Sequence, residues 1–485
     1  MASLNPLLLE TGVVCIGIVL LMLEAFAPKV CKRGLGYLAL LGLIVVFVAT
    51  FFVHPLPADS ASAQFYTTDF LAMFFKRFAL IVTALVLVMS LDYVDVIAKG
   101  VPGVTPNAGV GEYFILPLFT CAGLMWMASA VDFIMVFVSL ELVTISFYVM
   151  VAYTRKNALA LEAGTKFLIL GALSTGFLVY GITWIFGITH QTNLLKISQA
   201  LPLLPENTQT GLLFGLALVL VALGFKVAAA PFQFWIPDVY QGAPTPTTAF
   251  LSVGSKAAGF VVLLRVLDPF FTVPVIAHKL ITVFVILAAA TLLYGNLVAM
   301  LQSNLKRLLA YSSIAHAGYL LVGVASIGAA IATAAIAYYL VGYLLMTFLA
   351  FIVMLLVSKA AGGEEIEKFN GLGKRAPYLA LAMLVAMVSL AGLPFTVGFY
   401  GKFLIFTAAI ECHHWLLVVL GAISVACGFY YYLKVVRAMY WLEPVDGAAP
   451  IVVSPLSHVV ITTLIALIFV FGVYPTPILQ LLHWQ

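Results

Sequence analysis

The sequence predicts an all-α polytopic membrane protein with about fourteen transmembrane helices. Three observations predict this fold class: of the 485 residues 64% are hydrophobic, only 9% are charged, and the mean hydropathy is +1.16. A soluble domain carries about a quarter charged residues because its surface needs them. The 23 basic and 19 acidic side chains cannot cover a chain of this length. Composition therefore excludes a soluble enzyme, a disordered chain and a disulfide scaffold.

Fourteen apolar runs are long enough to cross a bilayer core, which takes around 20 helical residues. They cover residues 6–27, 36–53, 69–91, 112–129, 131–153, 161–186, 210–231, 245–267, 277–301, 310–328, 331–357, 377–408, 414–441 and 457–480. The gap near 130–132 is so short that it leaves a single merged helix possible. No run alternates between polar and apolar residues, as the strands of a membrane barrel would. Every predicted span is therefore a helix.

Lysine and arginine collect in alternate loops, and such loops stay on the cytoplasmic side. The first, fifth, ninth and eleventh loops hold Lys29, Lys32, Arg33, Arg155, Lys156, Lys306, Arg307, Lys359, Lys368, Lys374 and Arg375. The even-numbered loops hold few, chiefly Lys196 and Lys279. We therefore expect the odd loops to face the cytoplasm and both termini to lie on the other side. The short loops leave no room for a soluble catalytic domain.

The motifs of cofactor enzymes are missing from the sequence. There is no G-x-G-x-x-G, and Gly401-Lys402 lacks the upstream glycine of a phosphate-binding loop. The eight histidines are dispersed, and the cysteines Cys15, Cys31, Cys121, Cys412 and Cys427 occur singly. We expect structural thiols, no metal and no cofactor in this chain. Basic residues scattered in ones and twos also give no surface for nucleic acid.

Ionisable residues lie deep inside several apolar runs. They are Glu141, Lys166, Lys226, Lys256, His316 and Lys402. A charge at the bilayer centre costs about 2.5–3.5 kcal/mol on insertion scales, so such groups usually face a bundle interior or water and mark an ion or proton path. The alternative is that they form buried salt bridges or reach the helix ends, and it applies most to Lys166 and His316.

Six further charged residues lie nearer to the ends of predicted helices. They are Glu10, Glu24, Asp69, Lys76, Arg77 and Asp132. Long charged side chains at such positions can bury their stems and place their charge at the interface. We expect this behaviour, rather than a buried role, for all six.

A lysine beside a carboxylate suits proton transfer. Burial disfavours an ammonium ion, whereas a nearby negative charge favours it. Movement of Glu141 toward or away from Lys226 would therefore switch the amine between holding and releasing its proton. This chemistry needs no covalent intermediate.

Two predicted helices, the seventh and the twelfth, are interrupted by proline next to Lys226 and Lys402. Both carry A-x-x-P-F, at residues 228–232 and 391–395. Helix breaks at membrane depth are tolerated where they line a cavity, and paired breaks in two halves indicate an ion site. A repeat of five helices is inverted relative to its copy because five is odd. The predicted organisation is 1–111 (helices 1–3), 112–267 (first repeat), 268–441 (inverted second repeat) and 442–485 (the last helix).

The residues of the first break and its surroundings resemble a known family. The stretch from Gly224 to Lys256, which includes P-F-Q-F-W-I-P-D-V-Y-Q-G-A-P-T-P, closely resembles the antiporter-like membrane subunits of respiratory complex I (NADH-quinone oxidoreductase). Residues 302–316 and 389–394 match the same family. Lysine at 256, where subunits L and M usually have histidine, makes the chain most similar to subunit N. Lys402 also differs from the glutamate usual in M. Multisubunit sodium/proton antiporters share the fold.

The resemblance implies a proton-translocating membrane subunit, part of a translocase but without redox chemistry of its own. Glu141 would modulate Lys226, Lys256 would be the central relay, and Lys402 would connect to the opposite face. Lys166 and His316 would be accessory groups.

By the same resemblance, NAD, FMN, iron–sulfur clusters and quinone would be bound in partner subunits. The partners would be other membrane subunits of complex I, within the lipid bilayer of the bacterial inner membrane. Two alternatives stay open. One is a subunit of a cation/proton (Mrp-type) antiporter without redox coupling, and the other is a structural anchor whose lysines only stabilise packing.

Overall fold

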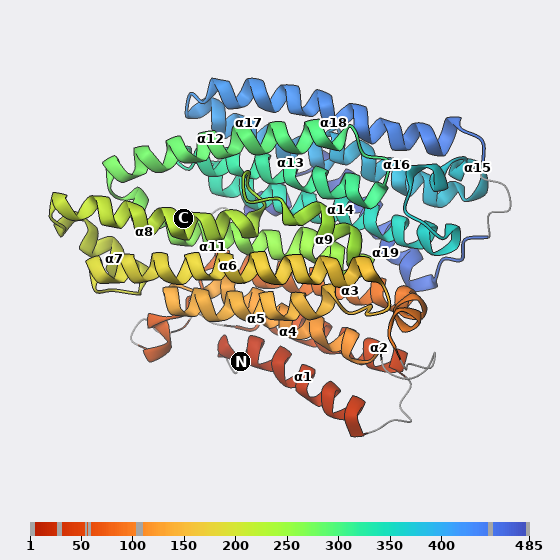
Figure 1. Ribbon diagram of the computed structural model, residues 1–485, viewed down its shortest axis with the longest axis horizontal. Coiled ribbons are helices and arrows are strands. Elements are labelled where there is room, and N and C mark those ends of the chain that lie inside the picture. Colours follow the sequence, from red (N-terminus) through yellow and green to blue (C-terminus); the bar gives the residue numbers. More distant parts are fainter. Residues whose placement is uncertain are drawn as a thin grey trace. The chain divides into compact units, whose positions relative to one another are not determined.

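A computed structural model describes residues 5–26, 32–53, 56, 60–102, 110–444 and 450–481. Lys29 and Cys31 lie outside these ranges. Within them the chain forms helices, and strand pairing is limited to three isolated bridges (Figure 1). Thirteen helices of the described ranges are long and apolar enough to span a membrane. The predicted all-helical membrane fold is confirmed.

The chain separates into two compact units. Unit 1 comprises Met1–Ala228 and Gly242–Leu280, and unit 2 comprises Ala229–Gln241 and Ile281–Gln485. One boundary between them falls at the predicted break of the seventh helix. The inverted repeat with boundaries at 112, 267, 268 and 441 stays a prediction.

Unit 1 contains the helices of the first half of the chain. They are α1 (Leu7–Phe26), α2 (Lys32–Ala49), α3 (Phe70–Gly100), α4 (Glu112–Ser129), α5 (Phe133–Val151), α6 (Ala158–Thr189), α7 (Leu194–Ala200), α8 (Gln209–Val227), α10 (Thr245–Phe250) and α11 (Lys256–Phe271). Short 3₁₀ turns cover Ala61–Gln64, Leu201–Leu203 and Glu206–Thr208. A π-helical turn, Leu251–Ser255, joins α10 to α11.

Unit 2 contains most of the remaining helices. They are α9 (Trp235–Gly242), α13 (Leu305–Ala325), α14 (Ala332–Ala361), α15 (Leu372–Arg375), α16 (Pro377–Ala391), α17 (Val397–Glu411), α18 (Trp415–Trp441), α19 (Pro455–Val473) and α20 (Thr476–Gln480). A 3₁₀ turn covers Ile366–Phe369. Most of α12 (Pro274–Ala299) also belongs to unit 2.

Helix starts in unit 1 follow from capping side chains. Asp132 accepts a hydrogen bond from the Ile134 amide at 2.8 Å and begins α5, so α4 and α5 are two helices and not one merged helix. Asp69 begins α3 in the same way, with the Ala72 amide at 2.8 Å. Such caps satisfy amides that the first turn of a helix leaves without partners.

Helices α6 and α8 of unit 1 pack through small residues. A Cβ atom on Gly181 would lie 2.6 Å from the Gly215 carbonyl oxygen, so neither position has space for a larger side chain. Close backbone approach of this kind is how helices associate where no water drives them together. The pairing holds α8, which carries Lys226 near its end, against a long neighbouring helix.

In unit 2, α13 and α14 form the interior, and nearly all of their residues are buried. Helices α18 and α19 bury only one side. The span predicted at 377–408 is two shorter helices, α16 and α17, separated at Gly392. The predicted break therefore lies where the second A-x-x-P-F motif placed it.

Candidate functional site

Lys226 of α8 and Glu141 of α5 lie on adjoining helices of unit 1. The Lys226 side chain is 8% exposed, and its Nζ donates a hydrogen bond to Thr144 Oγ1 on α5. Glu141 lies one turn before Thr144 on that helix, and its charge acts on Lys226. Thr175 Oγ1 of α6 donates to Glu141 Oε1 at 2.7 Å. The predicted Glu–Lys pair thus lies on adjoining helices with an electrostatic interaction between its members, and each member is hydrogen-bonded to a threonine that the sequence analysis did not single out.

Helix α8 ends immediately after Lys226. Ala228 has φ +71°, in the left-handed region, and its amide donates to the Gly224 carbonyl. The last carbonyls of a helix lack partners and carry partial negative charge, which favours a cation near them. Pro231 has no amide with which to continue the helix. The break therefore ends α8 directly after the residue that carries a buried amine, inside an otherwise apolar span.

Lys256 is the first residue of α11 and is buried in unit 1. The π-helical turn before it is of a kind that occurs frequently at functional sites. Gly259, one turn further on, faces α8: a Cβ there would lie 3.1 Å from Val227 Cγ1 and 3.5 Å from Lys226 Cβ. Gly259 therefore lets α11 approach the end of α8 closely, and the two lysines lie on adjoining helices.

Lys402 in unit 2 contacts the end of the helix before it. Its Nζ donates to the carbonyl oxygens of Leu390 at 2.9 Å and Ala391 at 2.8 Å, the last two residues of α16. The same Nζ lies 4.9 Å from the ring centroid of Tyr319 on α13. Gly392, with φ +94°, turns the chain out of α16. Lys402 thus occupies the second predicted break, and its ammonium is held by carbonyls that the break exposes.

His316 lies in the interior of unit 2 among tyrosines of three helices. Its Nδ1 is hydrogen-bonded to Tyr339 OH at 2.7 Å and its Nε2 to Tyr432 OH at 3.1 Å. Tyr432 is also hydrogen-bonded to Ser312. The Tyr319 ring, which faces Lys402, lies 6.1 Å from the imidazole between ring centroids. His316 therefore belongs to a buried polar cluster and not to a helix end.

Lys166 differs from the other predicted lysines. Its side chain is 42% exposed and pairs with Glu162, one turn earlier on α6, at 2.7 Å. Because α6 buries only one of its faces, a lysine at this register lies outside the bundle of unit 1. Of the two alternatives open for Lys166, the structure favours an ion-paired lysine that does not face the bundle interior.

Six charged residues near helix ends are expected from the sequence to bury only their stems and to place their charges at the membrane interface. This expectation is wrong for several of them. Glu10 and Lys76 are completely buried and form an ion pair with each other at 2.9 Å. Asp132 is buried as a helix cap, and Thr192 Oγ1 also donates to it at 2.7 Å. Glu24 pairs with Lys32 at 2.5 Å. In each case the charged group has a hydrogen-bond or ion-pair partner outside its own helix.

The contacts of the candidate residues that the sequence analysis missed are neutral side chains: Thr144, Thr175, Tyr319, Tyr339 and Tyr432. Hydroxyls are common within apolar helices, so their residue type gave no signal. Thr144 could have been found from its spacing, because residues three apart share one face of a helix. No three His, Cys, Asp or Glu side chains gather as a metal site in the ranges that the structure describes.

Comparison with known proteins gives one family. The family model described as "NADH:quinone oxidoreductase/Mrp antiporter, TM" matches residues 130–428. An NADH-quinone oxidoreductase subunit N from Moorella thermoacetica is 36% identical over 478 residues, which is 99% of this chain and 97% of that relative.

Solved structures from different assemblies share this fold. A chain of respiratory complex I from Thermus thermophilus superimposes with a TM-score of 0.81 at 30% identity, covering 97% of this chain and 98% of that one. A chain of the Mrp complex from Dietzia sp. DQ12-45-1b gives a TM-score of 0.84 at 18% identity, covering 98% and 95%. The second likeness concerns the fold alone.

Proposed function

Because this chain belongs to the NADH:quinone oxidoreductase/Mrp antiporter transmembrane family, we propose that it is the proton-translocating N subunit of an NADH-quinone oxidoreductase. The observation that carries the proposal is the set of buried amines at Lys226, Lys256 and Lys402. Two of them lie at the helix breaks and the third begins a helix after a π-helical turn. Such groups inside membrane helices are the usual elements of proton relays.

The first transfer in this proposal uses Glu141 and Lys226. The carboxylate favours the ammonium form of Lys226, and Thr144 accepts a hydrogen bond from that ammonium. If Glu141 is neutralised or moves away, burial disfavours the ammonium and Lys226 releases its proton. The adjoining helix carries Lys256, which would accept it.

Lys402 would complete the series as the group that exchanges protons toward the opposite face. Its two carbonyl partners stabilise the ammonium form, and a change at the α16–α17 break would remove them. Moving one proton against the membrane potential costs about 2.3 kcal/mol per 100 mV. One lost hydrogen bond to a charged group is worth about 1.5–3 kcal/mol, so a small rearrangement at a break matches the scale of one transfer.

The remaining assignments belong to the same proposal. NADH oxidation and quinone reduction would occur in other subunits, which would hold the NAD, FMN, iron–sulfur clusters and quinone. The partners would be the neighbouring membrane subunits of complex I. The chain is a multi-pass membrane protein, and we place it in a bacterial inner membrane with both termini on the non-cytoplasmic side. His316 would be an accessory group, as would Lys166 from its exposed face.

The antiporter alternative rests on a shared fold. The Mrp chain is 18% identical to this one, whereas the curated relative described as subunit N is 36% identical over almost its whole length. The N subunit is therefore the function supported best.

Lys226→Ala tests the proposal in the assembled complex. A positioned proton-transfer group contributes about 10²–10⁴-fold to a rate, so translocation through this subunit should be almost completely lost. The measurement is the number of protons moved per NADH oxidised in inverted membrane vesicles. Lys374→Ala is the matched control, because Lys374 lies on the surface and pairs with Glu443 at 3.3 Å. Unchanged pumping at normal subunit abundance would show that the relay role of Lys226 is wrong.

A further inference from the structure

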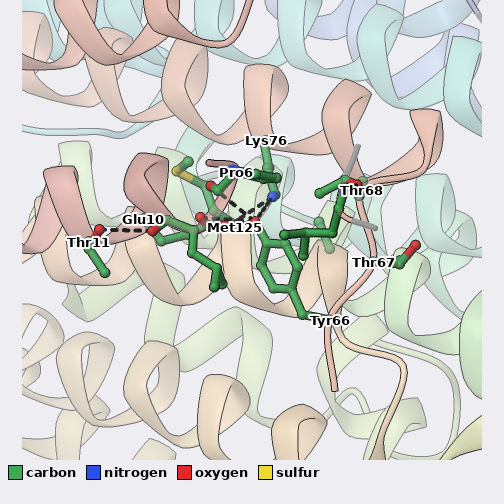
Figure 2. Close-up of polar contacts among 12 residues, drawn as sticks. Pro6, Glu10, Thr11, Tyr66, Thr67, Thr68, Lys76 and Met125 are labelled. Carbon is green, nitrogen blue, oxygen red and sulfur yellow. Dashed lines mark hydrogen bonds and ion pairs between the residues drawn. The ribbon is translucent and has the colours of Figure 1, made fainter. Parts of the chain in front are cut away.

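A buried ion pair lies outside the lysine series, in the first three long helices of unit 1. Lys76 Nζ of α3 lies 2.9 Å from Glu10 Oε1 of α1, and both side chains have no exposed surface. Tyr66, from the segment before α3, joins them. Figure 2 shows the three side chains pointing toward one another.

Tyr66 bridges the two charges. Its hydroxyl lies 3.0 and 3.1 Å from the two carboxylate oxygens of Glu10 and is also hydrogen-bonded to Lys76 Nζ. Burial and the Glu10 carboxylate raise the pKa of Tyr66, so the phenol keeps its proton. An ammonium can only donate and a carboxylate can only accept. The bonds therefore have one direction, from Lys76 to the Tyr66 oxygen and from the Tyr66 hydroxyl to Glu10.

This arrangement has a neutral alternative that needs no proton from outside. Lys76 can give a proton to the Tyr66 oxygen while Tyr66 gives its own to Glu10, which leaves an amine, a phenol and a carboxylic acid. The net charge is zero before and after the transfer. Removing two charges from water is costly, and only good geometry and further hydrogen bonds offset that cost. Complete burial therefore brings the charged and neutral forms closer in free energy than at a surface.

The cluster is also linked to α11, the helix that Lys256 begins. Asp69, the cap of α3, receives two hydrogen bonds from Arg265 of α11, at 2.9 and 2.7 Å. Arg265 also donates to the Ala128 carbonyl at 2.8 Å. Lys256 lies nine residues earlier on α11, about 13 Å along the helix. A change of charge at Lys76 therefore acts on Asp69 and on Arg265, and Arg265 shares α11 with Lys256.

We propose that Glu10, Tyr66 and Lys76 form an additional proton-holding site, in which one proton passes between Lys76 and Glu10 through the Tyr66 hydroxyl. The proposal rests on the proton-translocating function given above. The other groups that face the cluster are Asp69 at the start of α3, Cys121 and Ser129 of α4, and Arg265 of α11. The contrasting possibility is a static ion pair that only attaches α1 to α3.

Two substitutions in the assembled complex separate these possibilities. Lys76→Arg keeps a positive charge beside Glu10 but cannot release a proton. Tyr66→Phe keeps the direct Lys76–Glu10 pair and removes the bridging hydroxyl. A static pair tolerates both, whereas a proton-holding site loses its transfer in both. We expect fewer protons moved per NADH oxidised at normal subunit abundance, with Lys374→Arg, in an exposed ion pair, as the unchanged control.

A double variant guards against a failure to assemble. Glu10→Gln with Lys76→Met removes both charges together and so leaves no unpaired buried charge. We expect it to assemble and to pump less. Infrared difference spectra of the working complex should also contain a protonated carboxylic acid band that Glu10→Gln removes, which a packing role would not produce.

The outcomes are distinct. If the double variant assembles and pumps normally, or if Lys76→Arg and Tyr66→Phe both pump normally, the ion pair is static and the inference is wrong. If none of the variants assembles, the cluster is structural and the inference is again wrong. Lys226→Ala, measured in parallel, tests the proposed function itself, because only its failure to lower pumping counts against that function.

Discussion

Lys226 and Lys402, two of the proposed relay lysines, have different kinds of partner. Lys402 donates to two backbone carbonyls, which cannot change their charge. Lys226 donates a hydrogen bond to Thr144 and interacts electrostatically with Glu141. Unlike a backbone carbonyl, Glu141 can change its charge by gaining a proton. At the scale of single residues, the adjustable element is therefore the carboxylate on α5. Thr175 orients it by a hydrogen bond at 2.7 Å.

Glu141→Gln should separate charge from structure at this position. Glutamine keeps the size of the side chain and still offers Thr175 an acceptor, so the fold should persist. The loss of the negative charge should lower coupled quinone reductase activity severalfold, since one unit of pKa change corresponds to about 1.4 kcal/mol, or tenfold. Activity and subunit abundance are measured together in membranes. Glu443→Gln, at an exposed ion pair, is the control, and a loss of assembly in Glu141→Gln would favour the structural-anchor alternative.

At the scale of helices, the two breaks are built by different residues. The first ends α8 with Ala228, an alanine in the left-handed region, while the second ends α16 with Gly392 in the same region. Glycine adopts this conformation without a steric penalty, whereas in other residues it costs conformational free energy. The second break is also crowded, because a Cβ at Gly392 would lie 3.2 Å from Lys402 Nζ.

Gly392→Ala should therefore have two separate effects, one on the backbone and one on Lys402. The left-handed conformation costs alanine roughly 1–2 kcal/mol, and the new methyl group should push the Lys402 amine away from its carbonyl partners. Gly362→Ala is a matched control, since Gly362 ends α14 with φ +72° and has open space around its Cβ position. Both variants should lower the thermal stability of the detergent-solubilised complex, and only Gly392→Ala should reduce proton pumping. Equal pumping in the two would show that the space beside Lys402 is unimportant.

At the scale of the whole molecule, the distribution of basic loops fixes the orientation that we propose. Lys156 follows α5 in a predicted cytoplasmic loop, and Gln199 follows α6 in a predicted non-cytoplasmic one. Both side chains are exposed. Only one long helix, α6, lies between the two positions. If α6 spans the membrane, Lys156 and Gln199 must therefore lie on opposite faces.

Single cysteines at these places test the orientation. Lys156→Cys should react with a membrane-impermeant maleimide in inverted vesicles, and Gln199→Cys should react in vesicles of the opposite orientation. The native cysteines are replaced by serine beforehand, so the background reaction is low. The reverse pattern would mean that the positive-inside reading of the loops is wrong. Reaction of both positions from one side would contradict the spanning of the membrane by α6.

Much of the site could be predicted because charge is costly in an apolar span. Glu141, Lys226, Lys256 and Lys402 stand out against long hydrophobic runs, and the prolines mark where two helices break. Neutral hydroxyl partners could not be predicted in this way, since a threonine or tyrosine is tolerated at most membrane depths. Their roles depend on which helices pack together.

The sequence by itself determined the all-helical membrane fold and the approximate positions of its apolar spans, because hydrophobic length is a local property of the chain. Only the tertiary structure decided which charges find partners. Lys166, inside an apolar run, lies on an exposed face, whereas Glu10 and Lys76, near helix ends, are completely buried against each other. The physical reason is that the free energy of a charge depends on the groups packed around it, and those groups come from distant parts of the chain.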